Sequence, residues 1–401
     1  MMTSTTNHGR DSIPRVQHIS YFQAALEGIA EGLTFDVLRG CVRQVSNELS
    51  RRIGGGITAS RLEDAYTLWS PTTDAIGELM KLDLVERRPL PSKRISVDAH
   101  RDTTYALTQS GKEIIEQSHG DGSAFRRALT PLLIKRHTYF SSLCAALVEE
   151  PILIPEYSEE ELKEYKQTNE SWTVKLSEDA AERMRRSMKL ANVSSGAVTA
   201  QIRGALEKRF PPGAEPTTKD ILDTTLDALV VASLEARGLL FDAITFNVLM
   251  SWGRQLFVID ESRYVHGMLG RTIWSTADIK TLDDSITVSR RGLSEYGVRV
   301  ANQLEIAYRD IADAISSDLG GPAVRYPYLE IFKVRALAAY RVGVNISLVD
   351  RVIAEIVEQT RPATFRIELQ LGTSSWTFSE PPFRLGSRRY YVILIKPEGD
   401  E

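Results

Sequence analysis

The residues with the clearest chemistry are the basic ones that gather between positions 81 and 101. This stretch holds six lysine or arginine residues against three acidic ones, in a chain whose formal net charge is −4. Because guanidinium and ammonium groups bind phosphate oxygens, a local basic cluster in an acidic chain is typical of a polyanion-binding surface. The cluster predicts contacts with a nucleic-acid backbone from Lys81, Arg87, Arg88, Lys93, Arg94 and Arg101.

Small hydroxyl side chains precede this basic cluster. Ser70 stands before Pro71, a pair that predicts the first turn of a helix, because serine accepts a backbone N–H and proline needs no donor there. Apolar residues from 75 to 80 then recur at helical spacing. Ser70, Thr72 and Thr73 are expected to lie along the edge of this helix, where they can reach DNA.

The elements around the basic cluster follow a recognisable order between residues 58 and 117. Two helices precede a strand that begins near residue 84, a polar loop covers 91–102, and TTYALT returns as a second strand. Thr108 caps a closing helix that holds Gly111 in its first turn.

This order resembles the winged helix of bacterial regulators of the multiple-antibiotic-resistance and phenolic-acid-response types. The resemblance implies that the second helix reads double-stranded DNA while the wing, with Lys93, Arg94 and Arg101, reaches the backbone. Asp74 and Glu78 on that helix would repel phosphates. A winged helix that binds protein is therefore the alternative.

A second stretch with possible binding chemistry covers residues 171–210. Trp172, Val174 and Leu176 alternate with Thr173 and Lys175, which is the period of a strand. Two helices separated by a turn at 192–195 follow.

This second stretch resembles the ribbon-helix-helix module, in which two chains pair their strands into a ribbon that enters the major groove. The resemblance implies a homodimer in which Thr173 and Lys175 face bases and the amides near Ser194 and Ser195 hold a phosphate. A strand followed by a plain helical hairpin, or a module kept for dimerisation alone, explains the same pattern.

The rest of the chain is expected to form further small domains. Residues 1–18 read as a disordered tail, 19–120 as the winged-helix domain and 121–170 as a helical, acidic connector. GLLFDAI at 238–244 is similar to GLTFDVL at 32–38, and LSEYG at 293–297 is similar to LTQSG at 107–111. These similarities predict a second, diverged winged helix at 219–320 with an acidic wing at 275–288, and 321–401 is expected to be an α+β cap.

Two features near the C-terminus leave alternatives open. Between Arg361 and Lys396 there are six basic and two acidic residues, interleaved with aromatic ones, which suits either nucleic-acid binding or an ordinary exposed sheet. The long helix expected from Ser294 to Leu319 would pack either on a second copy or within its own domain.

No signature of catalysis or metal binding stands out. SGK at 110–112 lacks the preceding glycine of a phosphate loop, and the six histidines and two cysteines show no metal-ligand spacing. Glu368 and Gln370 resemble part of a nuclease core only faintly, with Asp350 as a distant partner. No catalytic residue, metal or cofactor is expected.

Composition places these patterns in an ordinary globular chain. At 401 residues, with 42% hydrophobic and 25% charged residues, the chain is long enough for several domains, and no apolar run is long enough to cross a membrane. The sequence predicts a cytoplasmic, mainly α protein with small β wings, tandem winged-helix-like domains and a C-terminal α+β cap. We expect a non-enzymatic, homodimeric, double-stranded-DNA-binding protein of the transcriptional-regulator type. The alternative is an interaction subunit of a larger DNA-handling complex that grips protein partners.

Overall fold

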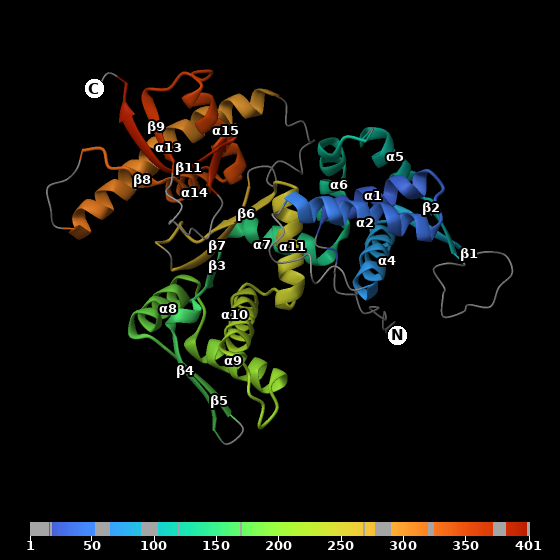
Figure 1. Cartoon of the computed structure of the whole chain (residues 1–401), viewed down its shortest axis with the longest axis horizontal. Coiled ribbons are helices and arrows are strands. Elements are labelled where there is room, and N and C mark those ends of the chain that lie inside the picture. The colour runs from blue at the N-terminus through green and yellow to red at the C-terminus, as the bar shows by residue number, and fades with distance from the viewer. Residues whose placement is uncertain are drawn as a thin grey trace, which may run out of the picture. The chain divides into compact units, whose positions relative to one another are not determined.

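The computed structural model of the chain is mainly helical with small antiparallel sheets, which confirms the expected fold class (Figure 1). The expected tail falls almost wholly outside the residues that the structure describes. These are residue 16 and residues 18–52, 65–89, 103–118, 120–168, 171–267, 269–276, 290–319, 325–371 and 382–398.

The chain divides into two compact units. The N-terminal unit combines residues 1–143 with 241–256, and the C-terminal unit combines residues 144–240 with 257–401. The sequence-based domain at 219–320 therefore contributes to both units.

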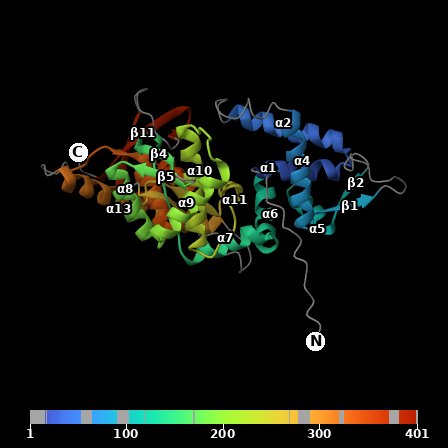
Figure 2. The same cartoon turned by 90° about the horizontal axis from the view of Figure 1, so that it is seen from below.

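The N-terminal unit contains the helix and strand order that the sequence predicts around the basic cluster. Its described elements are α1 (Ile19–Ala30), α2 (Phe35–Arg52), α4 (Ala65–Lys81), β1 (Val85–Pro89), β2 (Thr103–Leu107), α5 (Gln109–Ser118), α6 (Gly122–Arg136) and α11 (Ala243–Gln255), with α7 (Thr138–Glu149) crossing the boundary between the units. β1 and β2 form an antiparallel hairpin that lies at the edge of this unit in both views (Figures 1 and 2).

Apolar faces of α1, α2 and α4 meet in the core of the N-terminal unit. Phe22, Leu38 and Leu79, one from each helix, are fully buried. Trp252 of α11 completes this core, because its ring packs edge-on against Phe22 and its Nε1 donates to the carbonyl of Val16 at 2.6 Å. A helix more than 200 residues away in sequence therefore belongs to this core.

The start of α4 differs from the sequence prediction. The helix begins at Ala65, and Pro71 lies inside it, so Ser70 does not cap its first turn. Proline in a helix interior removes one backbone hydrogen bond, which is tolerated where tertiary packing fixes the helix. Ala75, Ile76 and Leu79 are buried as expected, whereas Met80 is 39% exposed.

The start of α5 agrees with the sequence prediction. The Thr108 hydroxyl accepts the N–H of Gly111 at 3.1 Å and donates to the carbonyl of Asp83 at 2.7 Å. A Cβ atom on Gly111 would lie 2.1 Å from the carbonyl oxygen of Leu84. Glycine is needed at this position because the helix begins directly against the backbone that leads into β1.

The C-terminal unit begins with a region that the sequence analysis read as an acidic connector. Its described elements up to residue 235 are β3 (Ile152–Pro155), a single 3-10 turn η1 (Glu159–Glu161), β4 (Leu162–Thr168), β5 (Ser171–Leu176), α8 (Glu178–Leu190), α9 (Ser195–Arg209) and α10 (Thr218–Glu235). The expected acidic helix is wrong, because only three residues form a turn and the next seven form a strand. LKEYKQT has Leu162 and Tyr165 as its apolar residues, and it pairs antiparallel with β5 with a register shift between Leu162 and Glu164.

The proposed echo of the first domain is present in one turn. Gly32 and Gly238 both have φ +71°, and the following leucine donates to the carbonyl five residues back, Leu33 to Gly28 and Leu239 to Leu234, each at 3.0 Å. Both glycines therefore end a helix with the same hydrogen-bonded motif. The similarity stops there, since LSEYG lies within a helix instead of at the end of a strand.

The expected wing at 275–288 falls outside the described part of the chain except for Ser275 and Thr276. β6 (Ile259–Ser262) and β7 (Gly270–Ser275) pair antiparallel and are joined by residues 263–269, and β3 completes the sheet on the other side of β7. Residues 277–289 follow the hairpin and lie outside the described part of the chain.

The remainder of the C-terminal unit combines one long helix, which the sequence analysis assigned to 219–320, with the α+β elements expected at 321–401. Its elements are α13 (Arg290–Leu319), β8 (Leu329–Glu330), α14 (Ile331–Val342), α15 (Ile346–Val357), β9 (Phe365–Leu371), β10 (Phe383–Leu385) and β11 (Arg388–Pro397). β11 pairs antiparallel with β8, β9 and β10. Val300, Leu304 and Tyr308 of α13 are buried in the core of this unit, whereas Val298 is 57% exposed.

Candidate nucleic-acid interface

Arg87 and Arg88 are neighbouring residues of β1, the first strand of the hairpin in the N-terminal unit. Val85 anchors β1 in the core, while both arginines are exposed. Arg88 forms an ion pair with Glu86 at 2.7 Å, and Arg87 lies opposite Tyr105 in the antiparallel register. Burial raises the pKa of Tyr105, and the charge of Arg87 opposes that shift. Because neighbouring residues of a strand point to opposite faces, the hairpin presents one guanidinium group on each face, and Val85 fixes the base of the strand in the core.

The structure does not support all of the hydroxyl groups predicted along α4. Thr72 is fully buried, so the expectation that it faces DNA is wrong. Thr73 is partly exposed. Ser70 lies within α4, and its side chain is outside the described part of the chain, as are Lys93, Arg94 and Arg101.

Lys81 holds a buried carboxylate as well as facing solvent. Its Nζ lies 2.9 Å from Glu78, whose side chain is 5% exposed and whose second oxygen lies 3.4 Å from His137 Nε2. Nδ1 of His137 accepts the N–H of Phe140 at 3.1 Å. Glu78 is buried and paired with Lys81, so its carboxylate does not face solvent from α4.

A second candidate surface is the β4–β5 ribbon in the C-terminal unit. Thr173 and Lys175 of β5 are exposed. Trp172 of the same strand is 5% exposed and packs edge-on against Phe210. Thr173 lies opposite Lys166, and Lys175 lies opposite Glu164. The outward and inward faces of β5 are therefore as predicted.

The partner strand of β5 comes from the same chain. β4 pairs with β5 along its length, so the ribbon does not need a second copy to satisfy its backbone (Figure 2). The dimer argument based on an unpaired strand is therefore wrong. Lys163 and Lys166 of β4 are exposed basic residues that the sequence analysis missed, because LKEYKQT lacks the regular alternation that predicts a strand.

Ser194 and Ser195 begin α9, as predicted. The Ser194 hydroxyl accepts the N–H of Ala197 at 3.1 Å, and both serines are exposed. Since the Ser194 side chain fills the cap, a phosphate at this helix start would have to be held by other donors.

The carboxylates considered for catalysis are each held by a cation. Glu368 lies 2.8 Å from Lys396 and accepts from Tyr328 at 3.1 Å, and the Lys396 contact holds the pKa of Glu368 below its usual value. Asp350 pairs with Arg335 at 3.2 Å. Among the described residues, no group of three or more His, Cys, Asp or Glu side chains could hold a metal ion. Burial raises the pKa of the Cys144 thiol to about 12.

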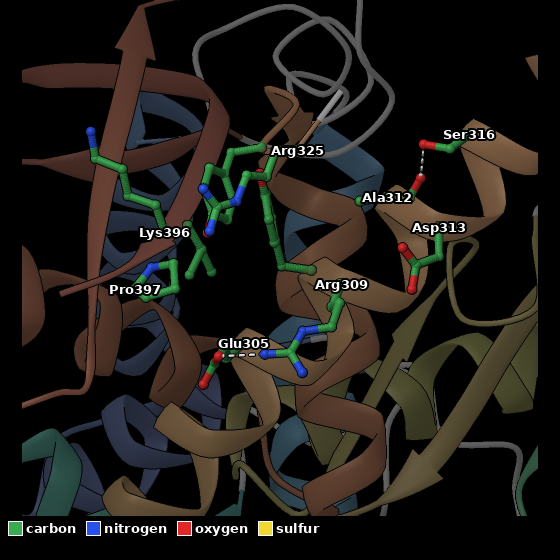
Figure 3. A pocket seen from close by; sticks show the side chains of 11 residues that line it. Glu305, Arg309, Ala312, Asp313, Ser316, Arg325, Lys396 and Pro397 are labelled. Atoms are coloured by element: carbon green, nitrogen blue, oxygen red, sulfur yellow. Dashed lines mark hydrogen bonds and ion pairs between the residues drawn. The ribbon is translucent and has the colours of Figure 1, made fainter. Parts of the chain in front are cut away.

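A pocket of about 400 Å³ lies beside α13 in the C-terminal unit. Figure 3 shows Glu305, Arg309, Asp313, Arg325 and Lys396 around it. Arg309 is joined to Glu305 at 2.6 Å, and Lys396 is the partner of Glu368. The pocket thus combines both signs of charge, and two of its cations are already paired.

Comparisons of the chain with protein-family models, curated proteins and solved structures gave no match. In the described part of the chain, no helix combines the length and apolar character that crossing a membrane requires. A function for the chain therefore has to be argued from its own residues.

Proposed function

We propose that this chain is a cytoplasmic, non-enzymatic protein of the transcriptional-regulator type that binds double-stranded DNA through its N-terminal unit. The observation that carries the proposal is the order of α1, α2, α4, the β1–β2 hairpin and α5, with Arg87 and Arg88 exposed on the hairpin. In a winged helix, the third helix lies in the major groove and the hairpin reaches the backbone.

The hairpin and α4 contribute differently to the free energy of DNA binding. Arg87 and Arg88 neutralise phosphates and release counterions, which strengthens binding to any sequence. Thr73 and Lys81 of α4 are the described candidates that face solvent, and they would discriminate bases. The charge of Lys81 is shared with Glu78, so it contributes less to phosphate binding than an unpaired lysine.

The proposal is tested by the salt dependence of DNA binding. Replacing both arginines (Arg87→Ala with Arg88→Ala) should weaken binding to all duplexes and reduce the slope of log K against log salt by about two. Fluorescence anisotropy with a labelled duplex at several salt concentrations measures this slope. The matched control removes two exposed charges from α6, Arg127→Ala with Lys135→Ala, and should leave the slope unchanged. An unchanged slope in the arginine variant would remove the hairpin from the interface.

We also propose that the chain acts as a homodimer, now for a different reason. Val298 and Ile306 are 57% and 41% exposed on α13, on the side away from buried Val300 and Leu304. Exposed aliphatic residues on a long helix suit contact with a second copy of the same helix. If the chain is instead an interaction subunit of a DNA-handling complex, this side of α13 would contact a different protein.

A further inference from the structure

The last strands of the C-terminal unit carry positive charges in an unfavourable arrangement. Arg384 of β10 lies directly opposite Arg389 of β11, and Arg366 of β9 lies directly opposite Lys396 of β11. Residues opposite each other on antiparallel strands point to the same face, and like charges in such pairs destabilise a sheet. This sheet therefore brings together two like-charged pairs.

Little in the described chain compensates these charges. Arg384, Arg388 and Arg389 are exposed, and none of the described carboxylates forms an ion pair with them. The only acidic residue in β9, β10 and β11 is Glu368, which is the partner of Lys396. The hydrogen bond to Glu368 raises the pKa of Lys396, and the charge of Arg366 opposes that shift. An external polyanion would relieve this repulsion.

The elements before this sheet favour DNA as the polyanion. α14 and α15 are joined by three residues that begin with Gly343 in the left-handed region at φ +72°, and Asn345 caps α15. A short turn that contains glycine is also the connection used in the helix-turn-helix, whose second helix fits the major groove. Ser347 and Arg351 are exposed on α15. Asp350 beside them is neutralised by Arg335.

We propose that the sheet face around Arg384 and Arg389 is a second surface that binds the phosphate backbone of duplex DNA, separate from the β1–β2 hairpin of the other unit. It holds phosphates between the guanidinium groups of Arg384 and Arg389, which lie opposite each other on the sheet. The chain then has one DNA-binding surface in each unit. When one unit binds a DNA segment, the other unit can bind a second DNA segment.

The test uses four forms of the full chain. They are the wild type, the hairpin variant Arg87→Ala with Arg88→Ala, the sheet variant Arg384→Gln with Arg389→Gln, and the combination of all four changes. In the hairpin background, the sheet changes should weaken duplex binding on the order of tenfold at low salt and reduce the salt slope by about two. A variant with Arg384→Lys and Arg389→Lys keeps the charges and should keep the slope.

The four forms separate this inference from the proposed function. If the hairpin variant binds like the wild type while the sheet variant loses binding, the proposed function fails and the inference stands. If the sheet changes leave binding and slope unchanged in both backgrounds, the inference is overturned. Weaker binding to vesicles of anionic phospholipid, with duplex binding unchanged, would likewise overturn it in favour of a membrane surface.

Folding is followed in the same variants. Removing two like charges from opposite strands should leave the unfolding temperature unchanged or raise it. A loss of binding with a retained unfolding temperature therefore reports on the surface itself. If these arginines had only a structural role, the Gln variant would have a lower unfolding temperature and the Lys variant would have the wild-type one. The salt slope of DNA binding would then be the same in both variants, and that result would contradict the proposal.

Discussion

At the scale of single residues, Thr72 shows that helical spacing alone can predict whether a side chain is buried. It precedes Ala75, Ile76 and Leu79 by three, four and seven positions, so it belongs to the same helical stripe and is buried with them. The sequence analysis placed Thr72 in a first turn, because Ser70 and Pro71 favour a helix start. The hydroxyl group of Thr72 suits DNA binding, but its spacing from the apolar residues of α4 already predicts a place in the core.

Gly111 carries a prediction at this scale. A Cβ atom there would meet the carbonyl oxygen of Leu84 at 2.1 Å, and backbone moves less easily than a side chain. Gly111→Ala should therefore lower the free energy of unfolding by about 1–3 kcal/mol. Urea unfolding followed by circular dichroism measures the change.

Gly77 is the matched control for Gly111. It lies inside α4, and nothing stands within 4 Å of the Cβ that alanine would add. Since glycine weakens a helix interior, Gly77→Ala should raise the free energy of unfolding by about 0.5–1 kcal/mol. Equal effects of the two changes would contradict the close approach described at Gly111.

At the scale of elements, the hidden strand was β4. The prolines and glutamates between 151 and 161 favoured a solvated connector, and the next seven residues lack the regular alternation that predicts a strand. Strand pairing is not local, so neither β4 nor β5 alone shows that they form one ribbon. The helix cap at Thr108 was predictable because it depends on one side chain and its nearest backbone, whereas the start of α4 depends on residues before Ser70.

The ribbon carries a prediction at this scale. A two-stranded ribbon of one chain can enter the major groove, where a good contact discriminates by about 1–3 kcal/mol. Thr173→Ala with Lys175→Ala should reduce the preference for a selected site on the order of tenfold, without loss of non-specific binding. Selection from random duplexes with wild type and variant measures this preference.

The control for the ribbon prediction removes the same residue types elsewhere. Thr199 and Lys189 are exposed on α9 and α8, and Lys189→Ala with Thr199→Ala should leave the selected motif unchanged. Recovery of one motif at equal enrichment from all three proteins would show that the ribbon does not read bases.

At the scale of the whole molecule, net charge is a poor guide to this chain. A formal charge of −4 gives no hint of DNA, yet basic residues gather on the β1–β2 hairpin and on the last sheet. The sequence shows both gatherings, because each falls within a short stretch. It does not show that Arg384 faces Arg389 or that Glu78 is buried, because those depend on register and packing between elements.

Assembly is the prediction at this scale. Val298→Asp with Ile306→Asp places two charges on the exposed side of α13 and should convert a dimer into a monomer at micromolar concentration. Sedimentation velocity measures the mass. The control introduces charges at other exposed aliphatic residues, Leu240→Asp with Ile244→Asp, and should leave the dimer intact. A wild-type chain that sediments as a monomer would contradict the homodimer and favour a different protein on α13.

The return of α11 to the N-terminal unit has a consequence for synthesis. Trp252 is fully buried in that unit, and its Nε1 donates to Val16 near the beginning of the chain. A ribosome that has just released residue 143 has therefore produced a unit whose core still lacks its largest aromatic residue. The unit closes only after about a hundred further residues have emerged, so the C-terminal unit's β3–β5 segment is already outside the tunnel when the N-terminal core is completed.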